Sequence, residues 1–429
     1  MISQTRFFLF GAAFLLGCLA GNAFFHAAAY QFPATGWQGS EGYREIAQNL
    51  LDHGLYSQNG ASPTANRPPL YPLFLSVWLA LFDSAGPSAA YAAQALLWIA
   101  NGLLIAALLR TRFKRPDAAL LALLLYGLHV HFGVEALTQR DTILFALLLT
   151  LYISGILYIH SAWGAPLAGA LAGLLYLTRP TGILFLPAFL LAYLPSSTGT
   201  SWPARLRRAG LVAGIAFGVS LPWHWHTIAV MNAPGLLPAS TSGENLYKGH
   251  FDGFLRVFPY VDLDLLNPHL NERTAGMCEI QRNQTLKQLG WEHLRDDPVG
   301  ALLRALVKTA ALYSPLRTPL GNGEISMQAN GARLDNFQLY APALWLVPLN
   351  LLILAGGVAF FFRFRRLGPT ERIFALHAFW ILLGLTAIHA LTFGESRHRL
   401  PFDGLLIIAS SLTISRWIPF FRALRTDDA

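Results

Sequence analysis

Carboxylates and arginines stand at four points where apolar segments of this chain end. Glu41 and Glu45 lie in "GWQGSEGYREIAQNL", residues 36 to 50, and the later stretches "EALTQRD", "LTRPTG" and "FGESRHRLPF" bring further charges. These stretches carry Arg140, Asp141, Arg179, Glu395, Arg397 and Arg399. Arginine binds phosphate bidentately, and a carboxylate can take a proton from an attacking hydroxyl. If they converge, these residue types suit a substrate with a phosphate head and a lipid tail.

The surrounding composition places these charges in a membrane protein. Of 429 residues, 54% are hydrophobic and only 13% are charged, and the apolar residues form long runs. A bilayer core needs roughly 20 apolar residues of helix. Spans are expected near residues 7–29, 88–109, 118–134, 142–159, 166–178, 181–195, 209–229, 340–362, 373–392 and 401–418, with 68–83 a further span or a half-embedded segment. The prediction is an all-α integral membrane protein with about 10–11 transmembrane helices.

Basic residues in the short loops give the orientation. With both termini in the cytoplasm, fifteen Lys and Arg fall on the inner side and six in the short outer loops. The apolar N-terminus is long enough for an uncleaved first helix, although a signal peptide is the alternative. Arginine outnumbers lysine 27 to 4, which hints at a bacterial, GC-rich coding sequence. We therefore expect a bacterial cytoplasmic (inner) membrane protein whose charged junctions face the periplasm.

Three regions follow from this map. Residues 1–229 form an N-terminal transmembrane module with a first outer loop at 30–87, residues 230–339 a large periplasmic segment, and residues 340–429 the C-terminal transmembrane helices. Residues 40–51 predict an amphipathic interfacial helix. "DDPVGALLRALVKTAALYSP" predicts another, capped by Asp296 or Asp297.

Ionisable residues at membrane depth are expensive unless they pair or face a wet cavity. Arg140 and Asp141 therefore predict a functional site, with a mutual salt bridge as the alternative. Arg67, in "NRPPLYP", either joins that site or snorkels to the interface. The chain shows no nucleotide-binding glycine loop, zinc signature or serine-nucleophile elbow, and its charge pattern gives no reason to expect nucleic acid.

In this order, "YREIAQNLLDHGLYS...NRPPLYPLFL", "ALTQRDTILFALLL", "LTRPTGILFLPAFLLAYL", "STSGENLYKGHFDG" and "GESRHRLPF" resemble the GT-C glycosyltransferases related to protein mannosyltransferases and the lipid A aminoarabinose transferase. The resemblance covers nearly the whole chain. It implies a GT-C fold and an inverting transfer from a polyprenyl-phosphate sugar, such as an undecaprenyl-phosphate sugar, to an acceptor hydroxyl of a lipid, glycan or protein. No cofactor is expected, and a divalent metal is left open.

The resemblance also implies roles for particular residues. An acidic base is expected in the first outer loop, where relatives carry an Asp and this chain has Gly39. Glu41 is the first candidate for the base and Asp141 the second, with Glu45 and Asp52 remaining. The donor phosphate is expected among Arg179, Arg397 and Arg399, with Arg67 or Lys248 joining them. Glu395, Arg140 and Tyr43 are expected to support these groups, and "SGENLYKGHFDG" to form either a flexible lid or an ordinary solvated loop.

Two other functions compete with a glycosyltransferase of the 2.4 enzyme class. A transporter or flippase for a phosphate-bearing lipid predicts internal repeats and charged residues at the bilayer midplane, and neither is visible in the sequence. A noncatalytic scaffold gives no reason for arginines at four outer junctions.

Overall fold

A computed structural model describes residues 4–30, 41–82, 87–159, 161–196, 201–233, 235–236, 238–316, 318, 322–326, 331–336 and 343–423. Gly39, where the sequence departs from its relatives, lies outside these residues. Helices dominate the described chain, which confirms the predicted all-α class apart from one short antiparallel pair of strands, β1 (Asn322–Ser326) and β2 (Gly331–Asn336).

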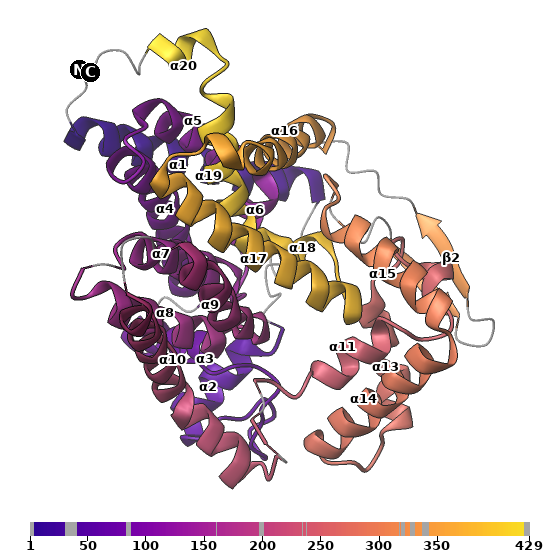
Figure 1. Ribbon diagram of the computed structural model, residues 1–429. Coiled ribbons are helices and arrows are strands. Elements are labelled where there is room, and N and C mark those ends of the chain that lie inside the picture. Colours follow the sequence, from indigo (N-terminus) through magenta and orange to yellow (C-terminus); the bar gives the residue numbers. More distant parts are fainter. Residues whose placement is uncertain are drawn as a thin grey trace.

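The N-terminal region is a bundle of apolar helices (Figure 1). Its elements are α1 (Gln4–Tyr30), α2 (Tyr43–His53), α3 (Leu70–Leu81), α4 (Pro87–Thr111), α5 (Pro116–Gly127), α6 (Val130–Glu135), α7 (Thr142–Leu157), α8 (Gly164–Thr178), the 3-10 turn η2 (Pro180–Leu184), α9 (Phe185–Ser196), α10 (Trp202–Trp225) and the π-helical turn η3 (His226–Val230). The expected amphipathic helix appears as α2, which buries Tyr43, Ile46 and Ala47 and leaves its polar face outward.

Three described helical segments are long and apolar enough to cross a bilayer: Gln4–Ala23, Ala90–Thr111 and Pro369–Leu391. Shorter apolar helices accompany them at Leu70–Leu81, Pro116–Gly127, Thr142–Leu157, Gly164–Thr178, Pro180–Leu194 and Val347–Phe362. The span expected at 118–134 is broken into α5 and α6 at His129, whose Nε2 lies 3.0 Å from Asp403 Oδ2 in the core. How many helices cross the membrane stays a prediction.

In the long polar segment, residues 230–339, the described residues fold mainly into helices. They are α11 (Ser242–Lys248), α12 (Phe254–Val257), η4 (Leu263–Leu266), α13 (Asn267–Arg273), α14 (Glu279–Asp296) and α15 (Pro298–Leu312). Asp297 caps α15 by accepting a hydrogen bond from the Gly300 N–H at 2.8 Å, as the sequence predicts. A separate apolar core that includes Phe254, Phe258 and Leu286 holds the segment together.

The C-terminal region completes the bundle with α16 (Ala343–Phe362), η5 (Phe364–Arg366), α17 (Pro369–Leu391), α18 (Ser396–Arg399), η6 (Leu400–Phe402), α19 (Asp403–Ile414) and α20 (Pro419–Ala423). Every residue of α19 is buried, because this helix is apolar on nearly all sides. Figure 1 shows α11, α13 and α14 across from α2, α3 and α10, with α17 and α18 beside them. The polar site forms where these three regions meet.

Candidate active site

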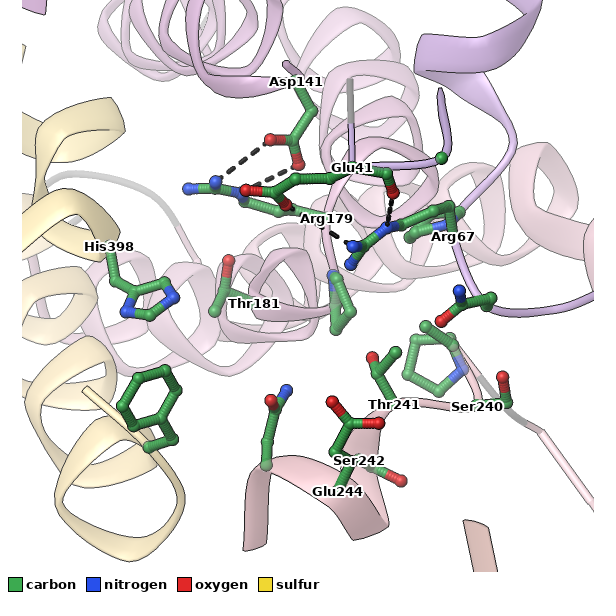
Figure 2. A pocket seen from close by; sticks show the side chains of 18 of the residues that line it. Glu41, Arg67, Asp141, Arg179, Thr181, Ser240, Thr241, Ser242, Glu244 and His398 are labelled. Carbon is green, nitrogen blue, oxygen red and sulfur yellow. Dashed lines mark hydrogen bonds and ion pairs between the residues drawn. The ribbon is translucent and has the colours of Figure 1, made fainter. Parts of the chain in front are cut away.

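A cavity of about 880 Å³ is lined by both the apolar bundle and the long polar segment. The bundle contributes four arginines to the lining: Arg67, Arg140, Arg179 and Arg397. They come from four different junctions between helices. The predicted convergence of distant charged residues therefore occurs in the structure, and Figure 2 shows part of it.

Glu41 lies among three of these guanidinium groups. Its carboxylate is 3.1 Å from Arg140 Nε, 3.4 Å from Arg397 Nη1 and 3.5 Å from Arg67 Nη2. Arg67 Nε also donates a hydrogen bond to the Glu41 carbonyl oxygen at 3.0 Å. Glu41 has a φ of 49° and Gly42 follows with 87°, so the chain turns in the left-handed region just before α2. A left-handed non-glycine residue costs on the order of 1 kcal/mol and is typical of functional sites.

These neighbours decide the charge of Glu41. Burial alone would raise its pKa, but Arg140, Arg397 and Arg67 oppose that effect and lower the pKa to about 2. The carboxylate is therefore ionised and able to accept a proton. A base works best when its pKa is near the working pH, so Glu41 is a weak base while all three arginines face it.

Asp141 is held differently from Glu41. Arg179 Nε donates to Asp141 Oδ2 at 2.9 Å and Arg179 Nη2 donates to Oδ1 at 3.0 Å, a bidentate pair that engages both oxygens (Figure 2). Asp141 is only 3% exposed. The alternative, a salt bridge between Arg140 and Asp141, is not observed. Arg140 instead contacts Glu41 and, at 3.6 Å, Glu135.

Arg397 links the bundle to the long polar segment. Its Nε lies 2.8 Å from Glu395 Oε2, and its two terminal nitrogens reach Glu41 and Asp264, each at 3.4 Å. Burial alone would lower the pKa of Arg397, but Glu395, Glu41 and Asp264 raise it well above its ordinary value. Glu395 is fully buried. It therefore orients the guanidinium, in the supporting position that the sequence suggests.

The wall opposite the arginines is rich in hydroxyl, amide and carboxylate groups. Ser240, Thr241, Ser242 and Glu244 line it, as Figure 2 shows. Glu279, at the start of α14, also lines the cavity. It accepts hydrogen bonds from Thr64 Oγ1 at 2.7 Å, Ala65 N at 2.8 Å and Ser240 Oγ at 2.5 Å. This carboxylate ties the first outer loop to the long polar segment.

Tyr43 lines the cavity at the start of α2, as a supporting residue should. Its ring lies 5.2 Å from the Arg67 guanidinium carbon and packs edge-on against Tyr71, with 5.0 Å between the ring centroids. Arg67 thus contacts Tyr43 and Glu41 and does not extend toward the lipid. Of its two predicted roles, the structure favours a place in the site.

Two predicted phosphate ligands do not line the cavity. Arg399 is 3% exposed and its guanidinium pairs with Asp403, with Nε 2.7 Å from Oδ1. Lys248 is 1% exposed, and its ammonium lies 2.8 Å from both Glu244 and Asp264. Because neither cation lines the cavity, the expectation that they contact the phosphate is corrected. The first part of the stretch expected to form a flexible lid or a solvated loop is the helix α11.

Glu45 and Asp52 also lie away from the cavity lining, on the exposed side of α2. Sequence reasoning missed Glu279, Asp264 and His389, which do line it. No spacing pattern marks them, because each is brought to the cavity by the packing of a different helix. In the part of the chain that the structure describes, no group of three or more His, Cys, Asp or Glu side chains is arranged to hold a metal ion.

Comparisons with known proteins agree with this architecture. The fold is shared with the oligosaccharyltransferase of Archaeoglobus fulgidus, solved with a tethered acceptor peptide, with a TM-score of 0.50, 16% identity and 94% of this chain covered. This chain spans about half, 49%, of the length of that protein. ArnT from Cupriavidus metallidurans bound to undecaprenyl phosphate matches with a TM-score of 0.40 and 15% identity, over 96% of this chain and 79% of its own.

At the sequence level, residues 66–226 match the family model of dolichyl-phosphate-mannose-protein mannosyltransferases. No curated protein sequence matches the chain. The matched range contains Arg67, Arg140, Asp141 and Arg179 and stops before the long polar segment. The family model and the shared fold together confirm the predicted resemblance to the GT-C superfamily of membrane glycosyltransferases.

Proposed function

We propose that this protein transfers a sugar from a polyprenyl-phosphate donor to an acceptor hydroxyl at the outer face of a bacterial cytoplasmic membrane. The observation that carries the proposal is Glu41, an ionised carboxylate surrounded by Arg67, Arg140 and Arg397 in one cavity. That grouping supplies a proton acceptor next to cations that suit a phosphate. No cofactor is needed for such a transfer.

In the proposed reaction the acceptor oxygen attacks the anomeric carbon of the sugar and inverts its configuration. Its proton passes to a Glu41 carboxylate oxygen, the bond from the anomeric carbon to the phosphate oxygen breaks, and the electron pair leaves with the phosphate. The guanidinium groups of Arg397, Arg179 and Arg67 stabilise the charge that develops on the phosphate. Glu41 later releases its proton to water.

The donor itself makes Glu41 a better base. A bound phosphate shares the arginines that otherwise hold the Glu41 pKa at about 2, so this pKa rises when the donor is in place. Asp141 is the weaker candidate because Arg179 engages both of its oxygens. Arg140 contacts both Glu41 and Glu135 and thereby helps to position the Glu41 carboxylate.

The donor lipid and the acceptor, whether lipid, glycan or protein, are part of this proposal. The oligosaccharyltransferase of Archaeoglobus fulgidus was solved with a tethered acceptor peptide, and ArnT from Cupriavidus metallidurans with bound undecaprenyl phosphate. The hydroxyl and amide groups of Ser240, Thr241, Ser242 and Asn245 on the long polar segment are suited to hold a polar acceptor.

The test is transfer by the purified protein. Radiolabelled undecaprenyl-phosphate sugars are incubated with the protein and with acceptors extracted from membranes. Label should enter an acceptor while undecaprenyl phosphate accumulates, and Glu41→Gln should abolish both. Movement of a fluorescent lipid across a proteoliposome bilayer, without any transfer of label, would instead identify a flippase.

A further inference from the structure

The cavity contains a pair of stacked histidines that the proposed phosphate chemistry does not use. His389, in the last turn of α17, and His398, in α18, both line the cavity. Their ring centroids are 4.8 Å apart with 20° between the ring planes. In Figure 2, the side chains of His398 and Thr181 both project toward the cavity.

Backbone contacts fix which nitrogen of each ring carries the proton. His389 Nδ1 lies 2.6 Å from the Phe393 carbonyl oxygen, which can only accept, so Nδ1 is the donor and Nε2 is an acceptor in the neutral ring. His398 Nδ1 accepts from the Glu395 N–H at 3.1 Å, so the neutral ring carries its proton on Nε2. Burial, His389, Arg397, Arg179 and Arg140 lower the pKa of His398 well below its ordinary value. The His398 ring is therefore neutral at physiological pH.

Two polar atoms at this place lack a partner among the described residues. His389 Nε2 is buried without a hydrogen bond, in a residue only 6% exposed, and the buried Thr181 Oγ1 is likewise unbonded. A buried polar atom without a partner is unfavourable, so a ligand that bonded to it would recover this cost. Both residues line the cavity, which gives such a ligand access to them.

We propose that His389, His398 and Thr181 form a subsite that hydrogen-bonds the hydroxyls of the sugar being transferred. His389 Nε2 accepts from one hydroxyl, and His398 Nε2–H donates to another. His398 directly follows Arg397 in the chain, and all three residues line the same cavity as Arg397, so the subsite adjoins the groups proposed to hold the phosphate to which the sugar is attached. The inference rests on the proposed function and adds how the donor sugar is recognised.

Neutral groups with fixed donor and acceptor roles suit a hydroxylated ring better than a second anion. The lone pair on His389 Nε2 would repel an anion, whereas it can accept a hydrogen bond from a hydroxyl. An acceptor chain is a less fitting occupant, because the wall across the cavity already offers Ser240, Thr241, Ser242 and Asn245 to it.

The test compares the binding of two kinds of lipid to the purified protein in nanodiscs. One is undecaprenyl phosphate, and the other is undecaprenyl phosphate carrying mannose, glucose, galactose or arabinose. The measured quantity is the ratio of the Kd of the bare lipid to that of the sugar-bearing lipid. We expect at least one sugar to raise this ratio above one in the unmodified protein.

Matched variants separate the two nitrogens of each ring. In His398→Asn and His389→Asn the amide can keep the backbone contact made by Nδ1 but has no group at the Nε2 position. In His398→Gln and His389→Gln the amide reaches the Nε2 position. The Asn variants should lower the ratio by about 3- to 10-fold, as expected for one lost hydrogen bond, with binding of the bare lipid unchanged. The Gln variants should retain most of the ratio.

His377→Asn is the control. His377 is also a buried histidine on α17, with Nδ1 2.8 Å from the Ile373 carbonyl oxygen, but it does not line the cavity. This variant should leave the ratio unchanged. The proposal of this subsite is overturned if no sugar raises the ratio above one. It is also overturned if the Asn variants weaken the binding of both lipids equally, or of neither lipid. The proposed function fails separately, if bare undecaprenyl phosphate does not bind or binds equally well to Arg397→Ala.

Discussion

Glu41 Oε1 lies 3.4 Å from Arg397 Nη1, although 356 positions separate the two residues in the sequence. Glu41 precedes α2 near the beginning of the chain, and Arg397 belongs to α18 near its end. The same guanidinium reaches Asp264 of the long polar segment. One side chain thus contacts carboxylates from the two other regions of the protein, and the cavity depends on all three.

Replacing the carboxylate of Glu41 tests its place in the reaction. Glu41→Gln keeps the size of the side chain but cannot take a proton, so turnover should fall by about 10²- to 10⁴-fold with little change in donor affinity. Asp141→Asn should also lose turnover, because it releases Arg179. Transfer of radiolabel measures both. Glu45→Gln, on the exposed face of α2, is the control and should keep full activity. Full activity of both Glu41→Gln and Asp141→Asn would show that the site is misplaced.

Arg397 and Arg399 should behave differently when each is changed to alanine. Arg397→Ala should weaken donor binding by about 10- to 100-fold, since a charge-assisted bond to phosphate is lost. Arg399→Ala leaves Asp403 buried without its arginine and should lower the free energy of unfolding by about 3–5 kcal/mol. Lipid titration and thermal unfolding in detergent measure the two effects. Unchanged donor affinity in Arg397→Ala would remove this residue from the phosphate site.

Acid should reveal the environment of Glu41. Its pKa is about 2 in the folded protein and 4.5 ordinarily, so the folded state favours the ionised form. The stability gained this way is present above pH 4.5 and is lost as the pH falls toward 2. The difference in Tm between the unmodified protein and Glu41→Gln should be constant above pH 5 and shrink below it. Bound undecaprenyl phosphate should move the onset of this decrease in the Tm difference to higher pH. A Tm difference that stays the same at every pH would contradict the lowered pKa of Glu41.

Glu279 should control how firmly the first outer loop is held. Glu279→Ala removes the acceptor for Thr64, Ala65 and Ser240, which should cost about 2 kcal/mol. The same free-energy change of about 2 kcal/mol corresponds to a rise of about 30-fold in the rate of hydrogen exchange at the Ala65 amide. The control is Glu292→Ala, on the same helix, where the carboxylate accepts an exposed hydrogen bond from Gln288 Nε2 at 2.9 Å. Equal exchange in both variants would show that Glu279 does not restrain the loop.

Much of the fold could be predicted because the physical signals are local. Apolar runs identify most of the helices, the amphipathic pattern predicts α2, and Asp297 followed by Pro298 predicts the start of α15. The break between α5 and α6 could not be predicted. It depends on the contact of His129 with Asp403, which lies 274 residues away.

The site was predicted in outline but not in detail. In "ESRHRLP" the two arginines are equivalent as residue types, yet α18 directs Arg397 to the cavity and Arg399 to the core. Two positions along a helix are about 200° apart, so both side chains cannot face the same space. Lys248 does not line the cavity because Glu244 and Asp264 hold its ammonium, and no sequence pattern indicates the pairing with Asp264.

The four arginines that the bundle contributes to the cavity come from four separate helix junctions, and this has a consequence for biogenesis. Each junction must be delivered to the same leaflet during insertion by the translocon. A helical hairpin inserted with inverted topology would leave its arginine on the opposite side of the bilayer. The other three arginines could not replace it. Activity would then show that the entire polypeptide has inserted in the correct orientation. Expression level and solubility in detergent are less stringent tests of this orientation.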